Sequence, residues 1–239
     1  MRYVPDRTGR FSQRPHFKPE ELDRECESII TGFLNDRYGK ISYPISTDDL
    51  TVLIERDTES LDQFADLSKY GPKVEGLTHF QPGRKSIVKI SARLAEDEYR
   101  HNRLRTTLAH EYGHVRFHAH LWDMEPPSID LLKRKPRANM QICYRDTMLD
   151  ATQSDWMEWQ AGYACGAFLM PASALRQKIR PYIEQHGLFG IAGERDLHGR
   201  QLIEIVKIGF DVSADAARIR LIKLGIIGPV GAGPSLFSS

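Results

Sequence analysis

The 239-residue sequence predicts an α+β protein in which a small antiparallel sheet packs on a mostly helical body. Apolar residues recur at the three-to-four-residue spacing of helices over most of the chain. Between two such regions, the β-rich runs 74–80 and 86–90 are separated by QPGRK, whose Pro-Gly pair suits a turn and predicts a hairpin. A hydrophobic content of 41% is sufficient to build a core.

The domain organisation follows from composition. Residues 1–17 are basic, contain prolines and show no periodicity, so we expect a loose, flexible arm. Residues 18–227 are expected to form a single domain. The segment 228–239, GPVGAGPSLFSS, is rich in Gly, Pro and Ser and is predicted to be a flexible tail.

Two helices are predicted before the hairpin. Proline is favoured at the first helical position, so Pro19 can begin a helix whose apolar residues recur at helical spacing to Asn35. Residues 46–48 can cap a shorter helix, which we favour, although the β-branched residues that follow also permit a strand. The hairpin could be extended by a further strand at 63–67.

The next helix, predicted at about 103–120, carries LAHEYGHVRFHAH, which holds four of the nine histidines of the chain. Because His110 and His114 are one helical turn apart, their imidazoles project from one face and can reach one Zn²⁺ ion. Glu111 lies about 100° around the helix from His110, so it can reach a metal-bound water without being a ligand. The pattern is the HExxH motif of zinc metallopeptidases.

This motif predicts hydrolysis. Zinc lowers the pKa of its water toward about 7, and a carboxylate base takes the proton as the hydroxide attacks a peptide carbonyl that the metal polarises. HExxH also arises by chance, in roughly two of every hundred shuffled chains of this composition. The amphipathic helix and Gly113, which leaves room beside His114, favour the metal site over histidines on a solvated face.

A catalytic zinc needs a third protein ligand, and three residues compete for that position. His120 has the spacing of the last histidine in HExxHxxGxxH, but the glycine of that pattern is absent here. His118 is about 12 Å along a straight helix from His110, too far to share a metal with it. Glu158 is the best candidate, since it lies on a predicted helix at about 156–170 whose small residues permit close approach, although tight core packing also explains those residues.

The remaining chain is predicted to be irregular and then helical. Residues 122–155 have mixed composition and are expected to form a long irregular connection, with a basic cluster at 133–137 that is more typical of a solvated loop than of a nucleic-acid patch. The segment at about 200–225 has the pattern of a helix-turn-helix with Ser213 as N-cap. Three basic residues there could contact phosphate, but core packing is the favoured role of the segment: Arg218, Arg220 and Lys223.

Two separated segments, RLRTTLAHEYGHVRFH and EWQAGYACGAFLMP, resemble the ImmA/IrrE family of gluzincin-like zinc metallo-endopeptidases. The resemblance implies a zincin-like fold and Zn²⁺ as the cofactor. It further implies His110, His114 and Glu158 as metal ligands and Glu111 as the catalytic general base. His118 matches a histidine common in that helix, with no role assigned. His118 and His120 are then expected behind the site or at the surface.

Members of this family typically cleave a DNA-binding repressor of the Xre type, so the resemblance implies a protein substrate of that class. An extended substrate could add as a strand to a sheet edge, for which the hairpin 74–90 is a candidate, although the sheet could equally serve only to cover the helices. The group that steadies the oxyanion is left open among Tyr163, Tyr144 and His118. The rival function is a non-hydrolytic regulator that binds a repressor or DNA through the segment 200–225.

Charge and cysteine content limit the partners and the compartment. A net charge of +1 provides no overall electrostatic attraction for nucleic acid, so direct nucleic-acid binding is not expected. The uncharged stretch 161–175 is too short for a membrane span and contains Pro171. Three cysteines without CxxC spacing fit a reducing environment, and we therefore expect a cytoplasmic protein.

Overall fold

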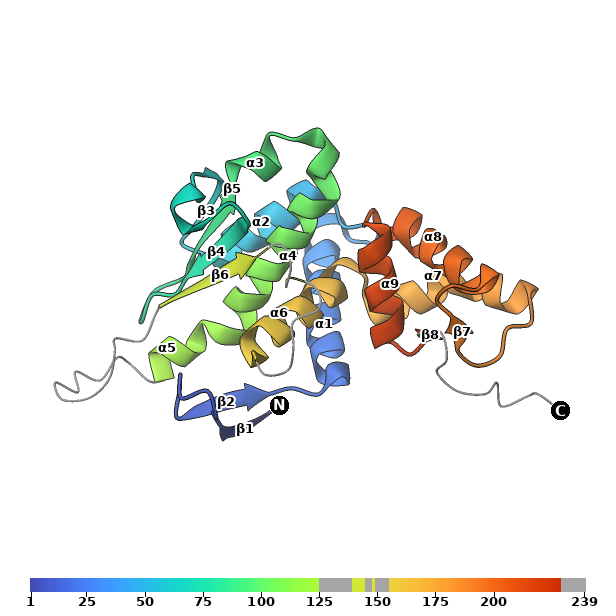
Figure 1. The fold of residues 1–239 in the computed structure, drawn as a ribbon, viewed down its shortest axis with the longest axis horizontal. Helices are drawn as coiled ribbons and strands as arrows, with labels where there is room; N and C mark the ends of the chain where they lie inside the picture. The colour runs from blue at the N-terminus through green and yellow to red at the C-terminus, as the bar shows by residue number, and fades with distance from the viewer. Residues whose placement is uncertain (125–138, 145–147, 149–154, 229–239) are drawn as a thin grey trace. The chain divides into compact units, whose positions relative to one another are not determined.

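The structure is a computed structural model, and it describes residues 1–124, 139–144, 148 and 155–228. Its elements define an α+β fold that is mostly helical and has a small sheet (Figure 1). The chain divides into two compact units, Met1–Glu25 with Thr47–Cys165, and Cys26–Ser46 with Gly166–Ser239. The segment 18–227, expected to be one domain, is therefore shared between both units.

The main sheet of the first unit has the strand order β3-β5-β4-β6. The predicted hairpin is confirmed, with β4 (Val74–His79) antiparallel to β5 (Ile87–Ser91). β6 (Met140–Tyr144) is also antiparallel to β4, whereas β3 (Ser60–Ala65) is parallel to β5. The expectation of an antiparallel sheet is thus wrong at one edge. The chain passes from β3 to β4 first, and β5 then returns between these two strands, parallel to β3.

This strand order also corrects two other expectations. Both strands of the hairpin are interior, since β4 lies between β5 and β6 and β5 between β3 and β4, so the hairpin cannot offer a free edge. Residues 140–144 were expected to be irregular, but they form β6. Most of the remaining connection, including the basic cluster 133–137, lies outside the described residues, as does the predicted tail beyond Gly228.

The first unit also contains the helices that precede and cover the sheet. α2 (Thr47–Asp57) confirms the favoured helix, and its buried Leu50, Leu53 and Ile54 supply core residues. The long helix α4 (His101–His118) contacts α2 and β4 and carries the histidines. Four short elements complete this region: η1 (Ser68–Tyr70), α3 (Ala92–Ala95), η2 (Glu98–Arg100) and α5 (His120–Met124).

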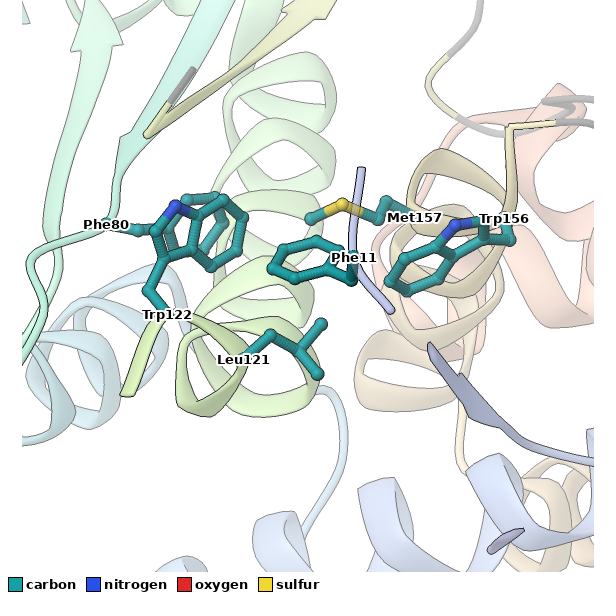
Figure 2. Packing of buried hydrophobic residues seen from close by; sticks show 6 residues of the cluster. All are labelled: Phe11, Phe80, Leu121, Trp122, Trp156 and Met157. Atoms are coloured by element: carbon teal, nitrogen blue, oxygen red, sulfur yellow. The ribbon is translucent and has the colours of Figure 1, made fainter. Parts of the chain in front are cut away.

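Residues 1–17 are not a loose arm but an antiparallel ribbon of β1 (Arg2–Pro5) and β2 (Gln13–His16). The carboxylate of Asp6 holds the loop, because it accepts hydrogen bonds from the backbone N–H groups of Thr8 and Phe11 at 3.0 Å each. Phe11 is buried in a hydrophobic cluster with Phe80, Leu121, Trp122, Trp156 and Met157 (Figure 2). Local hydrogen bonds of the Asp6 side chain and the burial of Phe11 therefore help to order the segment.

Two long helices are each divided between the units. α1 (Pro19–Tyr38) confirms the helix predicted to begin at Pro19, and α6 (Trp156–Leu169) confirms the helix predicted at about 156–170. Among the described residues, no helix is both long and apolar enough to cross a bilayer.

The second unit is helical, with α7 (Ala172–Gln185), α8 (Leu197–Phe210), α9 (Ala214–Lys223) and a two-stranded pair, β7 (Ala192–Gly193) and β8 (Ile227–Gly228). The predicted helix-turn-helix pattern is present in α8 and α9. The Ser213 side chain caps α9 by accepting a hydrogen bond from the N–H of Ala216 at 3.1 Å. Arg220 is 1% exposed and donates to the carbonyl of Met170, so it contributes to packing.

Candidate metal centre

Two helices of the first unit bring together the three predicted metal ligands. α4 presents His110 and His114, and α6 presents Glu158. The Nε2 atoms of the two histidines are 3.2 Å apart. Nε2 of His110 lies 3.2 Å from Oε2 of Glu158, and Nε2 of His114 lies 3.2 Å from Oε1 of Glu158. All three side chains are buried, and their donor atoms lie within 4.8 Å of one another. This group could hold a metal ion.

Close packing of α4 against α6 makes this convergence possible. A Cβ atom on Gly113 would lie 3.1 Å from the Cα and 3.2 Å from the carbonyl oxygen of Ala161. Even alanine at position 113 would therefore require the neighbouring backbone of α6 to shift by a few tenths of an ångström. The small-residue face of α6, noted in the sequence, does bring Glu158 to the histidines.

A hydrogen bond behind His110 sets which of its ring nitrogens faces the centre. Nδ1 of His110 lies 3.0 Å from the carbonyl oxygen of Met148, which can only accept. Nδ1 therefore carries the hydrogen, and Nε2 presents its lone pair toward Glu158 and His114. This is the tautomer that a metal-binding histidine requires.

A longer chain of hydrogen bonds sets the same tautomer for His114. Gln160 donates from its amide nitrogen to the carbonyl of Pro15 at 2.8 Å, so its Oε1 accepts from Nε2 of His118 at 3.1 Å. Burial, together with the nearby His114, holds the pKa of His118 well below its usual range, so His118 is neutral. Nδ1 of His118 then accepts a hydrogen bond from Nδ1–H of His114 at 3.0 Å. Nε2 of His114 therefore carries no hydrogen and presents its lone pair.

Glu158 is held from the other side. The amide nitrogen of Gln141, on β6, donates to Oε1 of Glu158 at 2.6 Å. Oε2 makes no hydrogen bond to any residue in the described ranges, although it is buried. Burial alone would raise the pKa of Glu158, but His114 and His110 hold it well below the usual range, so the group is a carboxylate.

The donor set fits a cation. Lone pairs of two imidazoles and of the Glu158 carboxylate converge at about 3 Å, which is unfavourable unless a positive charge lies between them. Burial alone would lower the pKa of His110, but the adjacent Glu158 raises it above the usual range. The carboxylate of Glu158 thus stabilises a positive charge at this position. Burial instead lowers the pKa of His114 despite the same carboxylate.

Glu111 lies beside this group without joining it. Its Oε2 accepts a hydrogen bond of 2.5 Å from the Thr78 hydroxyl on β4, and a Cβ atom on Gly76 would lie 2.3 Å from its Oε1. Burial, opposed mainly by His110, raises the pKa of Glu111 to about 7, which is suited to a proton acceptor near neutral pH. Gly76 and Thr78 share one face of the strand, and they position this carboxylate.

The sequence did not single out Gly76, Thr78, Gln141 or Gln160. Strand alternation in VEGLTHF could have placed the first two on one face toward the HExxH helix. Gln141 and Gln160 had no signal of their own, because their roles depend on residues that are distant in sequence. The structure assigns them through hydrogen bonds alone.

The other candidate residues lie outside the ligand group. His118 is directly behind His114, whereas Nε2 of His120 is 3.0 Å from the Tyr3 hydroxyl. Of the residues considered for the oxyanion, Tyr163 donates its hydroxyl hydrogen to Asp23 at 2.9 Å, and Tyr144 is exposed on β6.

The fold and the site define an α+β protein with a buried His-His-Glu group that could hold a metal ion. No model of a known protein family matches the chain, and a search of curated proteins finds no significant match either. The similarity of two sequence segments to the ImmA/IrrE family therefore stays a prediction.

Proposed function

We propose that this protein is a zinc-dependent endopeptidase with a zincin-like site of the ImmA/IrrE type. His110, His114 and Glu158 hold Zn²⁺, and Glu111 is the general base. The observation that carries this proposal is the separation of the two carboxylates. Glu158 converges with the histidines, whereas Glu111 is held against β4, close to the centre but outside the ligand group.

The number and type of ligands support a catalytic zinc. Structural zinc sites are usually closed by four protein ligands, whereas catalytic sites keep three and leave one position for water or substrate. Three residues form the group within the described ranges. Imidazole nitrogens with one carboxylate are a common zinc donor set.

The side chains then define the proton transfers. When bound, zinc polarises the scissile carbonyl and makes water more acidic. Glu111 accepts a proton from the attacking water as the water oxygen forms a bond to the carbonyl carbon. The same carboxyl group returns that proton to the amide nitrogen as the C–N bond breaks, which releases an amine and a carboxylic acid. A pKa of about 7 allows Glu111 to serve in both directions.

We also propose that the substrate is a protein in extended conformation, of the class of helix-turn-helix repressors of the Xre type, in the cytoplasm. β6 supports this mode of binding. It ends the order of the described strands, and its Gln141 contacts Glu158 directly. A peptide paired with that edge would bring its backbone next to the ligand group.

The rival function is a regulator that binds a repressor or DNA without hydrolysis. The pattern of α8 and α9 favours it, but the basic residues of α9 weigh against DNA. Arg220 is buried, and Arg218 forms ion pairs with Asp215 at 2.8 Å and with Glu194 at 3.3 Å. A mobility-shift assay without a partner protein tests this reading, since salt-sensitive binding to operator DNA would favour it.

The decisive experiment is cleavage of a purified Xre-type repressor by the wild type and by Glu111→Gln, with zinc content measured for both. We expect Glu111→Gln to retain zinc and lose cleavage. Glu55→Gln, at an exposed position of α2, is the matched control and should cleave normally. Normal cleavage by Glu111→Gln would show that Glu111 is not the general base. A wild type that binds no zinc would refute the proposed metal centre.

A further inference from the structure

The N-terminal ribbon, residues 1–17, contacts the supports of two metal-binding residues. On one side, Arg10 Nη1 donates to Oε1 of Gln141 at 3.1 Å, and the amide nitrogen of Gln141 donates to Glu158 at 2.6 Å. Because Arg10 occupies the oxygen of the Gln141 amide, the nitrogen is directed at the carboxylate. Arg10 thus orients Glu158 through a single intermediate residue.

On the other side, the ribbon supplies a backbone carbonyl. Pro15 accepts from the amide nitrogen of Gln160 at 2.8 Å, and this bond directs Oε1 of Gln160 at His118. His118 in turn accepts from His114. Pro15 therefore sets the direction of a chain of hydrogen bonds. At the end of this chain, Nε2 of His114 carries no hydrogen and can offer its lone pair to a metal.

The ribbon is itself held against the start of α6. Nε1–H of Trp156 donates to the Asp6 carboxylate at 3.2 Å. Phe11 packs between Trp156 and the α5 residue Trp122, with ring centroids 6.2 Å and 4.9 Å away respectively (Figure 2). Trp156 is two residues before Glu158, so the same contacts join the ribbon to the helix turn that carries the third ligand.

We propose that residues 1–17 are a positioning element of the metal centre, in which Arg10 orients Glu158 through Gln141 and the Pro15 carbonyl orients His114 through Gln160 and His118. The proposal rests on the metal centre of the proposed function, but not on peptide hydrolysis. The ribbon raises the affinity for Zn²⁺ and sets the geometry of its ligands. Loss of such outer partners typically weakens metal binding about 10-fold to 100-fold.

The test measures metal binding by the full chain. The dissociation constant for Zn²⁺ is obtained by competition with a chromophoric chelator, and Co²⁺ is substituted so that its visible absorption reports the ligand geometry. We expect Arg10→Gln to weaken Zn²⁺ binding about 10-fold and to alter the Co²⁺ spectrum. Arg10→Lys, which keeps a cationic donor, should restore the spectrum. Gln160→Leu, which breaks the second chain, should weaken binding about 10-fold to 100-fold.

Arg7→Gln is the matched control, because Arg7 lies in the same loop, is exposed, and loses the same charge. It should bind Zn²⁺ as the wild type does. Wild-type affinity and an unchanged Co²⁺ spectrum in both Arg10→Gln and Gln160→Leu would overturn the proposal, even if the thermal stability of the apo protein fell. Should Gln160→Leu fail to fold, Arg10→Gln decides alone. Failure of the wild type to bind Zn²⁺ would instead refute the metal centre, so the two failures are distinguishable.

Discussion

Gly76→Ala should separate catalysis from metal binding. The new Cβ atom would lie 2.3 Å from Oε1 and 2.9 Å from Cδ of Glu111. Ordinary contact begins at 3.4 Å, so the carboxylate must move by about 1 Å, away from the strand and from its bond with Thr78. A displacement of about 1 Å in a reacting group can cost about 100-fold in rate. We therefore expect kcat to fall about 100-fold.

The assay for this variant compares cleavage with zinc affinity. The atoms nearest to the new Cβ belong to Glu111 and Thr107 and not to the three ligands, so zinc binding should stay at the wild-type level. The added methyl group should also lower the free energy of unfolding by about 1–3 kcal/mol through overpacking. Gly32→Ala, where a Cβ atom would meet nothing within 4 Å, is the control. A Gly76→Ala protein that cleaves at the wild-type rate would refute the positioning of Glu111 by β4.

Three other predictions follow from single contacts. Glu158→Ala should weaken zinc binding by more than the roughly 100-fold that is typical for loss of a residue behind a ligand. Unchanged zinc affinity would make His118 or His120 the third metal ligand instead. Thr78→Val removes the donor to Glu111 at nearly constant shape, so cleavage should slow while zinc content stays constant; an unaltered rate would contradict a role for this hydroxyl. Burial would raise the pKa of Asp6, but hydrogen bonds from Thr8, Phe11 and Trp156 lower it overall. The lowered pKa stabilises the folded state at pH values above the unfolded pKa of about 3.9, and this contribution is lost as pH falls through the folded pKa. Urea unfolding should therefore show that Asp6→Asn is less stable than the wild type at pH 7. The difference in free energy of unfolding between the two proteins should narrow at acid pH. A gap that is constant with pH would refute this account.

The elements predicted correctly are those specified by local signals. The spacing of His110 and His114 needs only one helix, and the β4–β5 hairpin needs only two runs and a turn. The parallel pairing of β3 with β5 and the position of β6 depend on contacts between distant segments, so periodicity could not reveal them. The residues behind the ligands were missed for the same reason, since Gln160 acquires its role from Pro15, 145 positions earlier.

The ribbon at residues 1–17 was missed although its turn signals were present. Asp6 and Gly9 lie between the two strands, and Gly9 adopts a left-handed φ of 71° that favours glycine. The high content of Arg and Pro concealed this signal, because composition alone is typical of a disordered arm. The burial of Phe11 stabilises the ribbon, and that burial requires Trp122 and Trp156, which lie more than a hundred residues later.

The two glutamates of the centre show how environment separates the roles of identical side chains. Glu158 lies between two imidazoles and an amide donor, all of which stabilise its charge, so it remains a carboxylate, the form that can bind a metal. Glu111 faces the backbone of β4 and has one hydroxyl donor, and burial brings its pKa to about 7. A residue that must gain and lose a proton needs this weaker stabilisation, whereas a ligand must not be protonated. Gly76 contributes to this division, because a side chain there would displace Glu111 from its place against β4.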